Sequence, residues 1–209
     1  MSKVSLVWVT QDAENLIAYM ARVSNPENQD NPKTAPKLLR YLMEHKHWSP
    51  FEMVNVCMEI ETTRDIARQI LRHRSFSFQE FSQRYAVADG YEWAEARLQD
   101  TKNRQNSLEC QDKDLAKYWQ AAQTNVLMAA KEAYKSALAA GIAKEVARKV
   151  LPEGLTISRM YMNGTLRSWI HYTEIRCDLA TQKEHREVAD QCRDILVSLF
   201  PNIFKDDAA

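Results

Sequence analysis

The chain has 209 residues, 45% of them hydrophobic and 27% charged, and its 28 basic residues balance its 28 acidic ones. This composition is ordinary for a soluble globular protein and predicts one domain over residues 1–209 with a sizeable core. Zero net charge disfavours a globally basic surface that binds nucleic acid. The sequence has no signal peptide and no apolar run of about 20 residues, so we expect a cytoplasmic protein without a membrane partner.

The few cysteines and glycines exclude two further kinds of site. The four cysteines are far apart and form no CxxC pair, which argues against structural zinc. His45 and His47 could bind a metal, but a surface histidine and a hydrogen-bonded one are favoured, so we expect no metal site. With only four glycines the chain lacks GxGxxG and GxxxxGK[ST] phosphate loops. Any nucleotide must therefore be held by side chains and by the ends of helices and strands.

Hydrophobic periodicity predicts strands and helices in the first half of the chain. The expected elements are a strand over 4–9, a helix over 12–23, a helix over 36–45, a strand over 53–60 and a helix over 63–71. Val54, Val56, Met58 and Ile60 share one side of their strand, which is typical of a half-buried strand. Residues 80–85 alternate in polarity and are expected to be extended.

The second half is predicted to be mainly helical. Residues 87–111 lack periodicity and are expected to form a long loop with at most one helical turn, and 102–107 could cover a site or stay solvated. The other expected elements are a helix over 112–140 that ends at Gly141, a short helix over 143–150, a strand over 155–163 with a turn at Gly164, and helices over 165–176 and 181–199.

Positive charge is concentrated in and after the helix over 63–71. Arg64, Arg68 and Arg72 are four residues apart and share a helix face, where they repel each other unless anions lie among them. Arg64 is expected to lie on a solvated face. For Arg68 and Arg72 an anion site is a stronger possibility, because the basic run continues past the end of the helix.

Glu80, Ser82 and Arg84 could together bind one small polar ligand. In an extended segment they share one face at a spacing of roughly 6–7 Å. Arginine and serine suit phosphate oxygens, and glutamate suits a hydroxyl or a ring N–H. From spacing alone, an anion or nucleotide site and a structural cluster of ion pairs are equally supported.

The sequence lacks the usual nucleophiles and metal clusters of hydrolases. Ser82 with His73 as its base would be a nucleophile, but no GxSxG turn and no orienting acid support this role. A phosphate-binding serine is the better interpretation of Ser82. An arginine-rich polar site without a nucleophile suggests that a bound organic cofactor supplies the difficult chemistry.

The basic segment, residues 72–84, matches a known family signature. Arg72-His73-Arg74, followed after seven residues by Ser82, resembles the RHR-x7-S motif of the flavin-dependent thymidylate synthases. Ser77, Glu80 and Arg84 fit the fuller form of that motif. Other stretches resemble segments of the same family: 21–24, 47–52 (HWSPFE), 146–152 (VARKVLP) and 163–176. The similarity extends from about residue 13 to residue 201.

The resemblance implies an α+β fold, a single domain in which an antiparallel sheet is flanked by long α-helices. It also implies a methyltransferase that converts dUMP to dTMP, with 5,10-methylenetetrahydrofolate as carbon donor and NADPH as reductant through FAD. No enzyme nucleophile attacks the uracil ring in this family. Its members are homotetramers whose active sites are shared between subunits, and their partners are small-molecule substrates rather than nucleic acid.

The resemblance also implies roles for individual residues. Arg176 would contact the uracil ring and stabilise the negative charge that develops on it. The residues implied to hold dUMP are Gln69, Arg72, Glu80, Ser82, Gln83, Arg84, Arg148 and Arg176. The residues implied to contact FAD are Ser24, His47, Ser49, Glu52, Arg72, His73, Arg74, Glu80, Asn163, Arg167 and His171.

Two other kinds of protein remain as alternatives. A non-enzymatic module could bind nucleotides or RNA through the same arginines, although the neutral net charge argues against it. Its affinity for a polynucleotide would fall steeply with salt. A structural helical protein with a buried ion-pair network would bind no chromophore.

Overall fold

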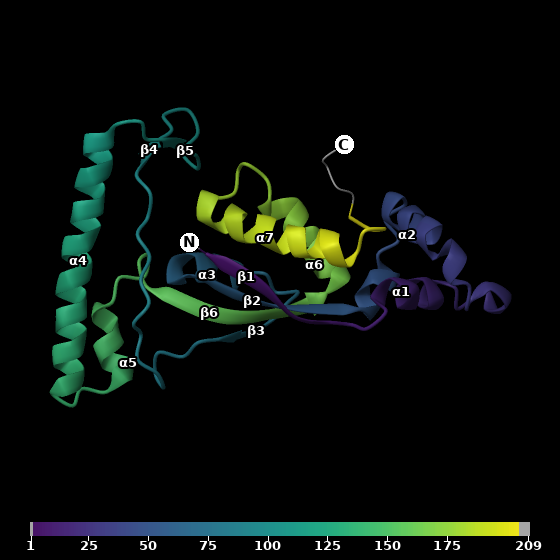
Figure 1. Ribbon diagram of the computed structural model, residues 1–209, viewed down its shortest axis with the longest axis horizontal. Coiled ribbons are helices and arrows are strands. Elements are labelled where there is room, and N and C mark those ends of the chain that lie inside the picture. The colour runs from purple at the N-terminus through teal and green to yellow at the C-terminus, as the bar shows by residue number, and fades with distance from the viewer. Residues whose placement is uncertain (1, 205–209) are drawn as a thin grey trace.

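The structure is a computed structural model that describes residues 2–204, and its centre is a four-stranded antiparallel sheet (Figure 1). The strands, in spatial order, are β1 (Lys3–Val9), β2 (Asn55–Thr63), β6 (Ile157–Thr165) and β3 (Ser77–Glu80). A separate two-stranded hairpin pairs β4 (Arg97–Gln99) with β5 (Ser107–Glu109). The short strand β3 pairs with β6 and so brings the end of the basic segment to one edge of the sheet.

Seven α-helices and four short 3₁₀ helices complete the described part of the chain. The α-helices are α1 (Ala13–Ala21), α2 (Ala35–Glu44), α3 (Arg64–Ile70), α4 (Lys113–Ala139), α5 (Lys144–Ala147), α6 (Leu166–Arg176) and α7 (Lys183–Leu199). The 3₁₀ helices are η1 (Pro26–Asn28), η2 (Pro32–Thr34), η3 (Ser49–Met53) and η4 (Arg148–Val150).

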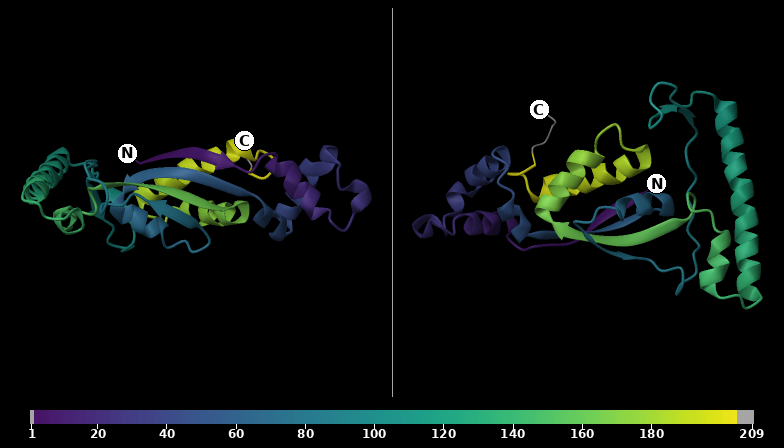
Figure 2. Two further views of the ribbon diagram at one scale, coloured as in Figure 1. Left: turned by 90° about the horizontal axis from the view of Figure 1, so that it is seen from below. Right: turned by 180° about the vertical axis from the view of Figure 1, so that it is seen from behind.

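The core lies between one face of the sheet and the helices α6 and α7, which cover that face (Figure 2). Met58 and Met160 are among the strand residues that are fully buried there. Trp169 of α6 is also fully buried, and its indole N–H donates a 3.0 Å hydrogen bond to the carbonyl oxygen of Val56. Burial of one sheet face explains the alternation that predicted the strand over 53–60.

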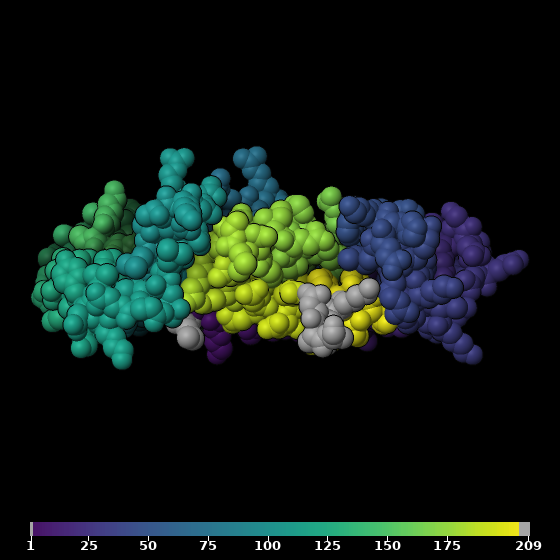
Figure 3. All heavy atoms as spheres, turned by 90° about the horizontal axis from the view of Figure 1, so that it is seen from above, coloured from purple at the N-terminus to yellow at the C-terminus, as the bar shows by residue number. Residues whose placement is uncertain are grey.

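Of the remaining α-helices, α3 packs against β2, β6 and α7, and the others lie at the two ends of the molecule. α4 and α5 form an arm at one end, and α1 and α2 lie at the other, with α6 and α7 between them (Figures 1 and 3). Asp112 caps α4 by accepting hydrogen bonds from the backbone of Asp114 and Leu115. Gly141 follows with φ of 84°, the left-handed conformation expected of a glycine after a helix.

The fold class is confirmed, since an antiparallel sheet with long helices is present, and every predicted strand and helix has a counterpart. Three local expectations are wrong. The extended segment ends at Glu80, and a turn follows in which the backbone N–H groups of Tyr85 and Ala86 both donate to the carbonyl of Ser82 at 3.1 Å. Gly164 lies inside β6 rather than in a turn. The region over 87–111 contains the β4–β5 hairpin instead of a helical turn.

Among residues 2–204, no helix is long and apolar enough to cross a membrane.

Candidate active site

The basic segment begins where α3 ends and is folded into two consecutive turns. The backbone N–H of His73 donates to Ile70 at 3.0 Å, and that of Phe76 donates to His73 at 3.2 Å. The Phe76 ring is buried and packs edge-on against Trp169, with ring centroids 4.8 Å apart. Phe76 therefore anchors the segment in the core, while Arg72 and Arg74 remain exposed for a ligand.

Gly164 is what allows Phe76 to approach β6. A Cβ atom at this position would lie 2.4 Å from Cδ1 of the Phe76 ring, closer than packed atoms come. The φ of Gly164 is not in the left-handed region, so backbone conformation does not require a glycine here. Close packing against the Phe76 ring requires it instead. The position of the basic segment depends on this contact.

His73 and Arg176 meet directly. The Arg176 Nε–H donates a 2.9 Å hydrogen bond to Nε2 of His73. Burial, followed by the charge of Arg176, lowers the pKa of His73 from 6.5 to about 4. His73 is consequently neutral at pH 7, with its proton on Nδ1, and its Nε2 is engaged. The imidazole orients the guanidinium of Arg176 and is not a free base for Ser82.

A second group of polar side chains extends from this pair into the core. His185 Nε2 lies 3.1 Å from the hydroxyl of Tyr172, and His185 Nδ1 lies 3.2 Å from Oε1 of Gln69. The Gln69 amide N–H in turn donates to Oε1 of Gln182 at 2.7 Å. The sequence analysis missed His185 and Tyr172. The sequence pattern that could have indicated His185 is its helical spacing from Val188 and Cys192. All three residues lie on the apolar face of α7 and are buried.

Acidification is expected to destabilise the protein through His185. Burial, then the charges of Arg176 and His73, lowers its pKa from 6.5 to about 3, whereas the unfolded chain restores a pKa of about 6.5. Between these values the unfolded state binds a proton that the folded state does not, so the free energy of unfolding decreases as pH falls from about 6.5 toward 3. Urea titrations across this range measure the slope. His185→Leu should have a shallower slope than the wild type, and equal slopes in the two proteins would contradict the assignment.

A third group lies where β6 runs into α6. The Thr165 hydroxyl donates to Oε2 of Glu52 at 2.6 Å, and an Arg167 N–H donates to Oε1 of the same carboxylate at 3.3 Å. Ser168 Oγ donates to the backbone carbonyl of Ser75 at 3.4 Å, which joins this group to the basic segment. Asn163 Oδ1 is buried without a hydrogen-bond partner. An acceptor that lacks a donor therefore lies on β6 two residues before Thr165.

The predicted face of Glu80, Ser82 and Arg84 is not formed. Glu80 accepts a 2.6 Å hydrogen bond from Ser158 and pairs with Arg64 at 3.4 Å. The Arg64 side chain is only 13% exposed, so the expectation of a solvated Arg64 is wrong. Ser82 lies in the turn after β3, where its Oγ accepts from the backbone N–H of Arg84 at 3.3 Å.

Two further arginines of this region form ion pairs within the chain. Arg84 pairs with Glu145 at 3.1 Å, and Arg68 pairs with Glu153. The structural ion-pair interpretation therefore applies to these guanidinium groups in the single chain. Gln83 differs, because its side chain is buried and its Nε2 has no partner. Such a buried donor without an acceptor is an exception to the usual pairing of buried polar groups.

A separate aromatic cluster lies at the other end of the molecule, in the last turn of α2 and just after it. The Tyr41 ring stacks on His45 with centroids 3.9 Å apart, and it meets His47 edge-on at 5.8 Å. The buried Arg22 side chain donates to the carbonyl of Asn31 at 2.6 Å and to Thr34 Oγ1 at 2.7 Å, and so holds the loop that follows Ser24.

Among residues 2–204, no three histidine, cysteine or acidic side chains are grouped so as to bind a metal.

Comparisons with known proteins agree with this architecture. The family model described as "Thymidylate synthase complementing protein" matches residues 5–202. The flavin-dependent thymidylate synthase of Synechocystis sp. is 56% identical over 190 residues, which are 91% of this chain and 87% of that protein. A probable flavin-dependent thymidylate synthase of Paramecium bursaria Chlorella virus 1 is 52% identical over 194 residues, 92% of this chain and 89% of that one. A crystal structure of a UMP/dUMP methylase, PolB, from Streptomyces cacaoi bound with 5-Br dUMP superposes with a TM-score of 0.86 at 27% identity, covering 97% and 93% of the two chains.

The chain belongs to the flavin-dependent thymidylate synthase family. The resemblance drawn from the RHR-x7-S motif is therefore confirmed at the level of the family. Membership extends over nearly the whole chain, because the matched residues 5–202 include both end regions and the arm.

The residues expected to hold flavin in this family include unsatisfied polar groups. Asn163 Oδ1 requires a donor, and an N–H of a bound ring can supply one. The exposed cations Arg72 and Arg74 suit a pyrophosphate, and Arg167, paired with Glu52, follows Asn163 at the start of α6. The donor set of this flavin-dependent thymidylate synthase therefore fits a dinucleotide with a hydrogen-bonding ring.

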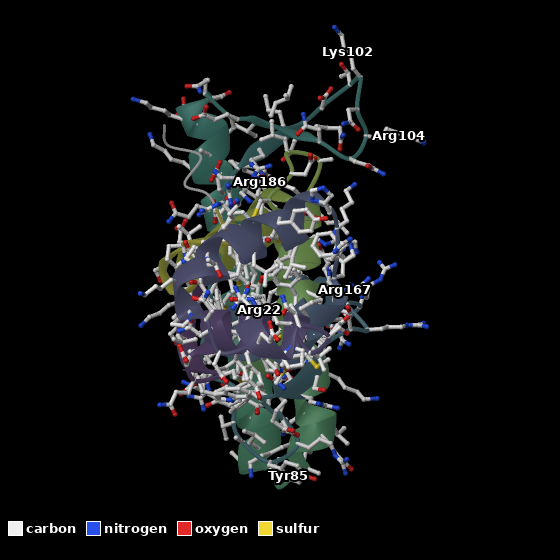
Figure 4. The ribbon with its side chains drawn as sticks, turned by 90° about the vertical axis from the view of Figure 1, so that its right-hand side faces the viewer. Arg22, Tyr85, Lys102, Arg104, Arg167 and Arg186 are labelled. Atoms are coloured by element: carbon white, nitrogen blue, oxygen red, sulfur yellow. The ribbon has the colours of Figure 1, made fainter. Side chains whose placement is uncertain are left out.

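One chain does not bring all of the expected site residues together. Arg148 begins η4 on the arm with α4 and α5, whereas Ser24 and His47 follow α1 and α2 at the opposite end (Figure 1). In the view of Figure 4, Tyr85 lies at the bottom, Lys102 and Arg104 lie at the top, and Arg167 lies between them. In this view Lys102 and Arg104 therefore lie away from Arg167.

Proposed function

We propose that this chain converts dUMP to dTMP by reductive methylation, with 5,10-methylenetetrahydrofolate as carbon donor and NADPH as reductant through bound FAD. Family membership makes the protein a flavin-dependent methyltransferase that forms dTMP. The observation that supports the residue-level proposal is the contact of His73 with Arg176, which joins the family motif to the end of α6.

Arg176 is the catalytic residue in this proposal. An arginine guanidinium keeps its positive charge in proteins. The neutral imidazole of His73 accepts a hydrogen bond from the Arg176 Nε–H and adds no charge of its own. A fixed cation against the pyrimidine stabilises negative charge that develops on the ring during transfer. The neutral state of His73 is essential to this arrangement, because an imidazolium would repel the guanidinium.

Nucleotide binding is assigned to the surrounding donors and cations. Gln83 Nε2, which has no partner in the chain, and the Ser82 hydroxyl are donors suited to phosphate or sugar oxygens, and Gln69 supplies an amide beside His185. The arginines Arg72 and Arg84 add positive charge, although Arg84 must exchange Glu145 for the ligand. Glu80, held by Ser158 and Arg64, presents an acceptor to a hydroxyl.

Flavin binding is assigned to the basic segment and the end of β3, to residues along β6 and α6, and to the loops that precede β2. The proposed contacts are Ser24, His47, Ser49, Glu52, Arg72, His73, Arg74, Glu80, Asn163, Arg167 and His171. When bound, the flavin supplies the hydride, so the protein needs no nucleophile of its own. The engagement of His73 with Arg176 agrees with this, since Ser82 then has no base.

A homotetramer with shared active sites explains the separation of the site residues. Arg148 follows α5 and Ser24 follows α1, at opposite ends of one chain, so one active site can include both only if two copies contribute (Figure 1). The arm also exposes large apolar side chains on α4, including Tyr118 at 69% and Met128 at 66%. Exposed apolar groups of this size are typical of surfaces that another subunit covers. A cytoplasmic location stays a prediction.

Product analysis tests the proposed function. Purified protein supplied with FAD, NADPH, dUMP and 5,10-methylenetetrahydrofolate should form dTMP, identified by mass, and omission of any one component should stop its formation. Absence of dTMP from the complete mixture contradicts the proposal. Polynucleotide binding that falls steeply with added salt would instead favour the RNA-binding alternative.

Ser82→Ala is expected to weaken dUMP binding about five- to tenfold while retaining measurable turnover. The serine hydroxyl contributes one hydrogen bond to phosphate, which is worth about 1 kcal/mol net. Initial rates at varied dUMP concentration measure the change as a raised KM with a largely preserved kcat. A variant with normal dUMP affinity and no activity would contradict the binding role of Ser82.

A further inference from the structure

We propose that His185 is a positioning residue that acts through Gln69 and determines which end of the Gln69 amide faces the nucleotide. The inference deepens the proposed function, because it assumes that Gln69 contacts dUMP. His185 lies on α7, outside the motif, and its side chain is completely buried behind Gln69.

The hydrogen bonds of Tyr172 fix the tautomer of His185. The Tyr172 residue is fully buried, and burial raises the pKa of its hydroxyl well above the ordinary value, so the hydroxyl keeps its proton. Within residues 2–204, the hydrogen-bond partner of this hydroxyl is Nε2 of His185, at 3.1 Å. A buried donor without an acceptor is costly, so Tyr172 donates and Nε2 accepts. The remaining imidazole proton is therefore on Nδ1.

The Nδ1 proton then fixes the amide of Gln69. Nδ1 lies 3.2 Å from Oε1 of Gln69, and a carbonyl oxygen can only accept. If the amide were flipped, its NH₂ group would face the Nδ1–H, and two donors would oppose each other without an acceptor between them. His185 therefore holds Gln69 with its oxygen inward and its NH₂ group outward.

The outward NH₂ group selects an acceptor on the ligand. In this structure it donates to Oε1 of Gln182 at 2.7 Å. Gln182 is held in turn by Glu184, whose second oxygen accepts from Arg97 of β4 at 2.5 Å. The exchange of Gln182 for a carbonyl or phosphate oxygen of dUMP keeps this amide satisfied. A ligand group that is itself a donor would be rejected.

Two substitutions separate the hydrogen bond from the bulk of the side chain. His185→Asn places an amide N–H near the position of Nδ1 and retains the donor to Gln69, whereas His185→Leu fills similar space without a donor. Calorimetric titration of FAD-loaded protein with dUMP should show about a tenfold weaker Kd for His185→Leu and a change within about twofold for His185→Asn.

A double-mutant cycle shows whether the effect passes through Gln69. In a Gln69→Ala background, His185→Leu should cause no further loss of dUMP affinity, because there is no amide left to orient. A loss of the same size in both backgrounds, or a His185→Leu protein with normal dUMP affinity, would overturn the positioning role. Equal weakening by His185→Asn and His185→Leu would overturn it as well.

The tautomer can be read without any nucleotide. Long-range ¹⁵N–¹H spectra of the wild type should show His185 protonated at Nδ1, and a proton on Nε2 would overturn the inference. Wild-type protein with the Nδ1 tautomer that does not bind dUMP would instead contradict the proposed function. The two failures are therefore distinguishable.

Discussion

Arg176→Ala is expected to lower the rate of dTMP formation by about two to three orders of magnitude, the effect of removing one preorganised charge-stabilising group. The side chain lies in the last turn of α6 and its hydrogen bond is to His73, so its loss leaves the core packing intact. Single-turnover measurements of dTMP at saturating dUMP give the change in the chemical step.

Arg176→Lys is the matched control for charge. Lysine keeps the positive charge but lacks the planar guanidinium whose Nε–H meets His73, so we expect only partial recovery. Both variants should retain flavin and unfold near the wild-type temperature. Full activity of Arg176→Ala in a folded, flavin-bound protein would contradict the catalytic assignment, and loss of the fold would show that the arginine is structural.

Gly164→Ala is expected to destabilise the protein by about 2–3 kcal/mol, at the upper end of the cost of overpacking a core. The added methyl group would lie 2.4 Å from a carbon of the Phe76 ring, and β6 is paired on both sides, which limits its movement. Because Phe76 anchors the basic segment, flavin binding should weaken at the same time. Urea unfolding and flavin titration measure the two effects.

Gly154→Ala is the control for this substitution. A Cβ atom there would meet its nearest neighbour, Asp65, at 3.9 Å, which is ordinary van der Waals contact. Its stability should change by less than about 0.5 kcal/mol. In a Gly164→Ala protein, a second change of Phe76→Leu should restore part of the stability by making room for the methyl group. Equal stability of the two single variants would contradict the packing argument.

Local patterns were sufficient to predict most of the fold. The alternation over 53–60 reflects one buried sheet face, and the alanine-rich pattern ending at Gly141 reflects a helix with a left-handed residue after it. Gly164 was misassigned because glycine is common in turns, and only the structure shows the ring that lies against it. The end of the extended segment at Glu80 depends on the turn at Ser82, which alternating polarity does not reveal.

The candidate site was less accessible to sequence reasoning. Charge spacing located the basic segment but misassigned Arg64, since its partner Glu80 is 16 residues away and is brought near by β3. The contact of His73 with Arg176 joins residues 103 positions apart, so no local pattern could indicate it. His185 was hidden for the opposite reason, because a buried histidine on an apolar helix face resembles an ordinary core residue.

The visible absorption spectrum of the purified protein, recorded before and after addition of NADPH with and without dUMP, tests the central claim most directly. We predict a flavin spectrum that bleaches on reduction, at a rate that depends on dUMP, because flavin and nucleotide share one site. A protein that stays colourless after incubation with FAD would contradict the account.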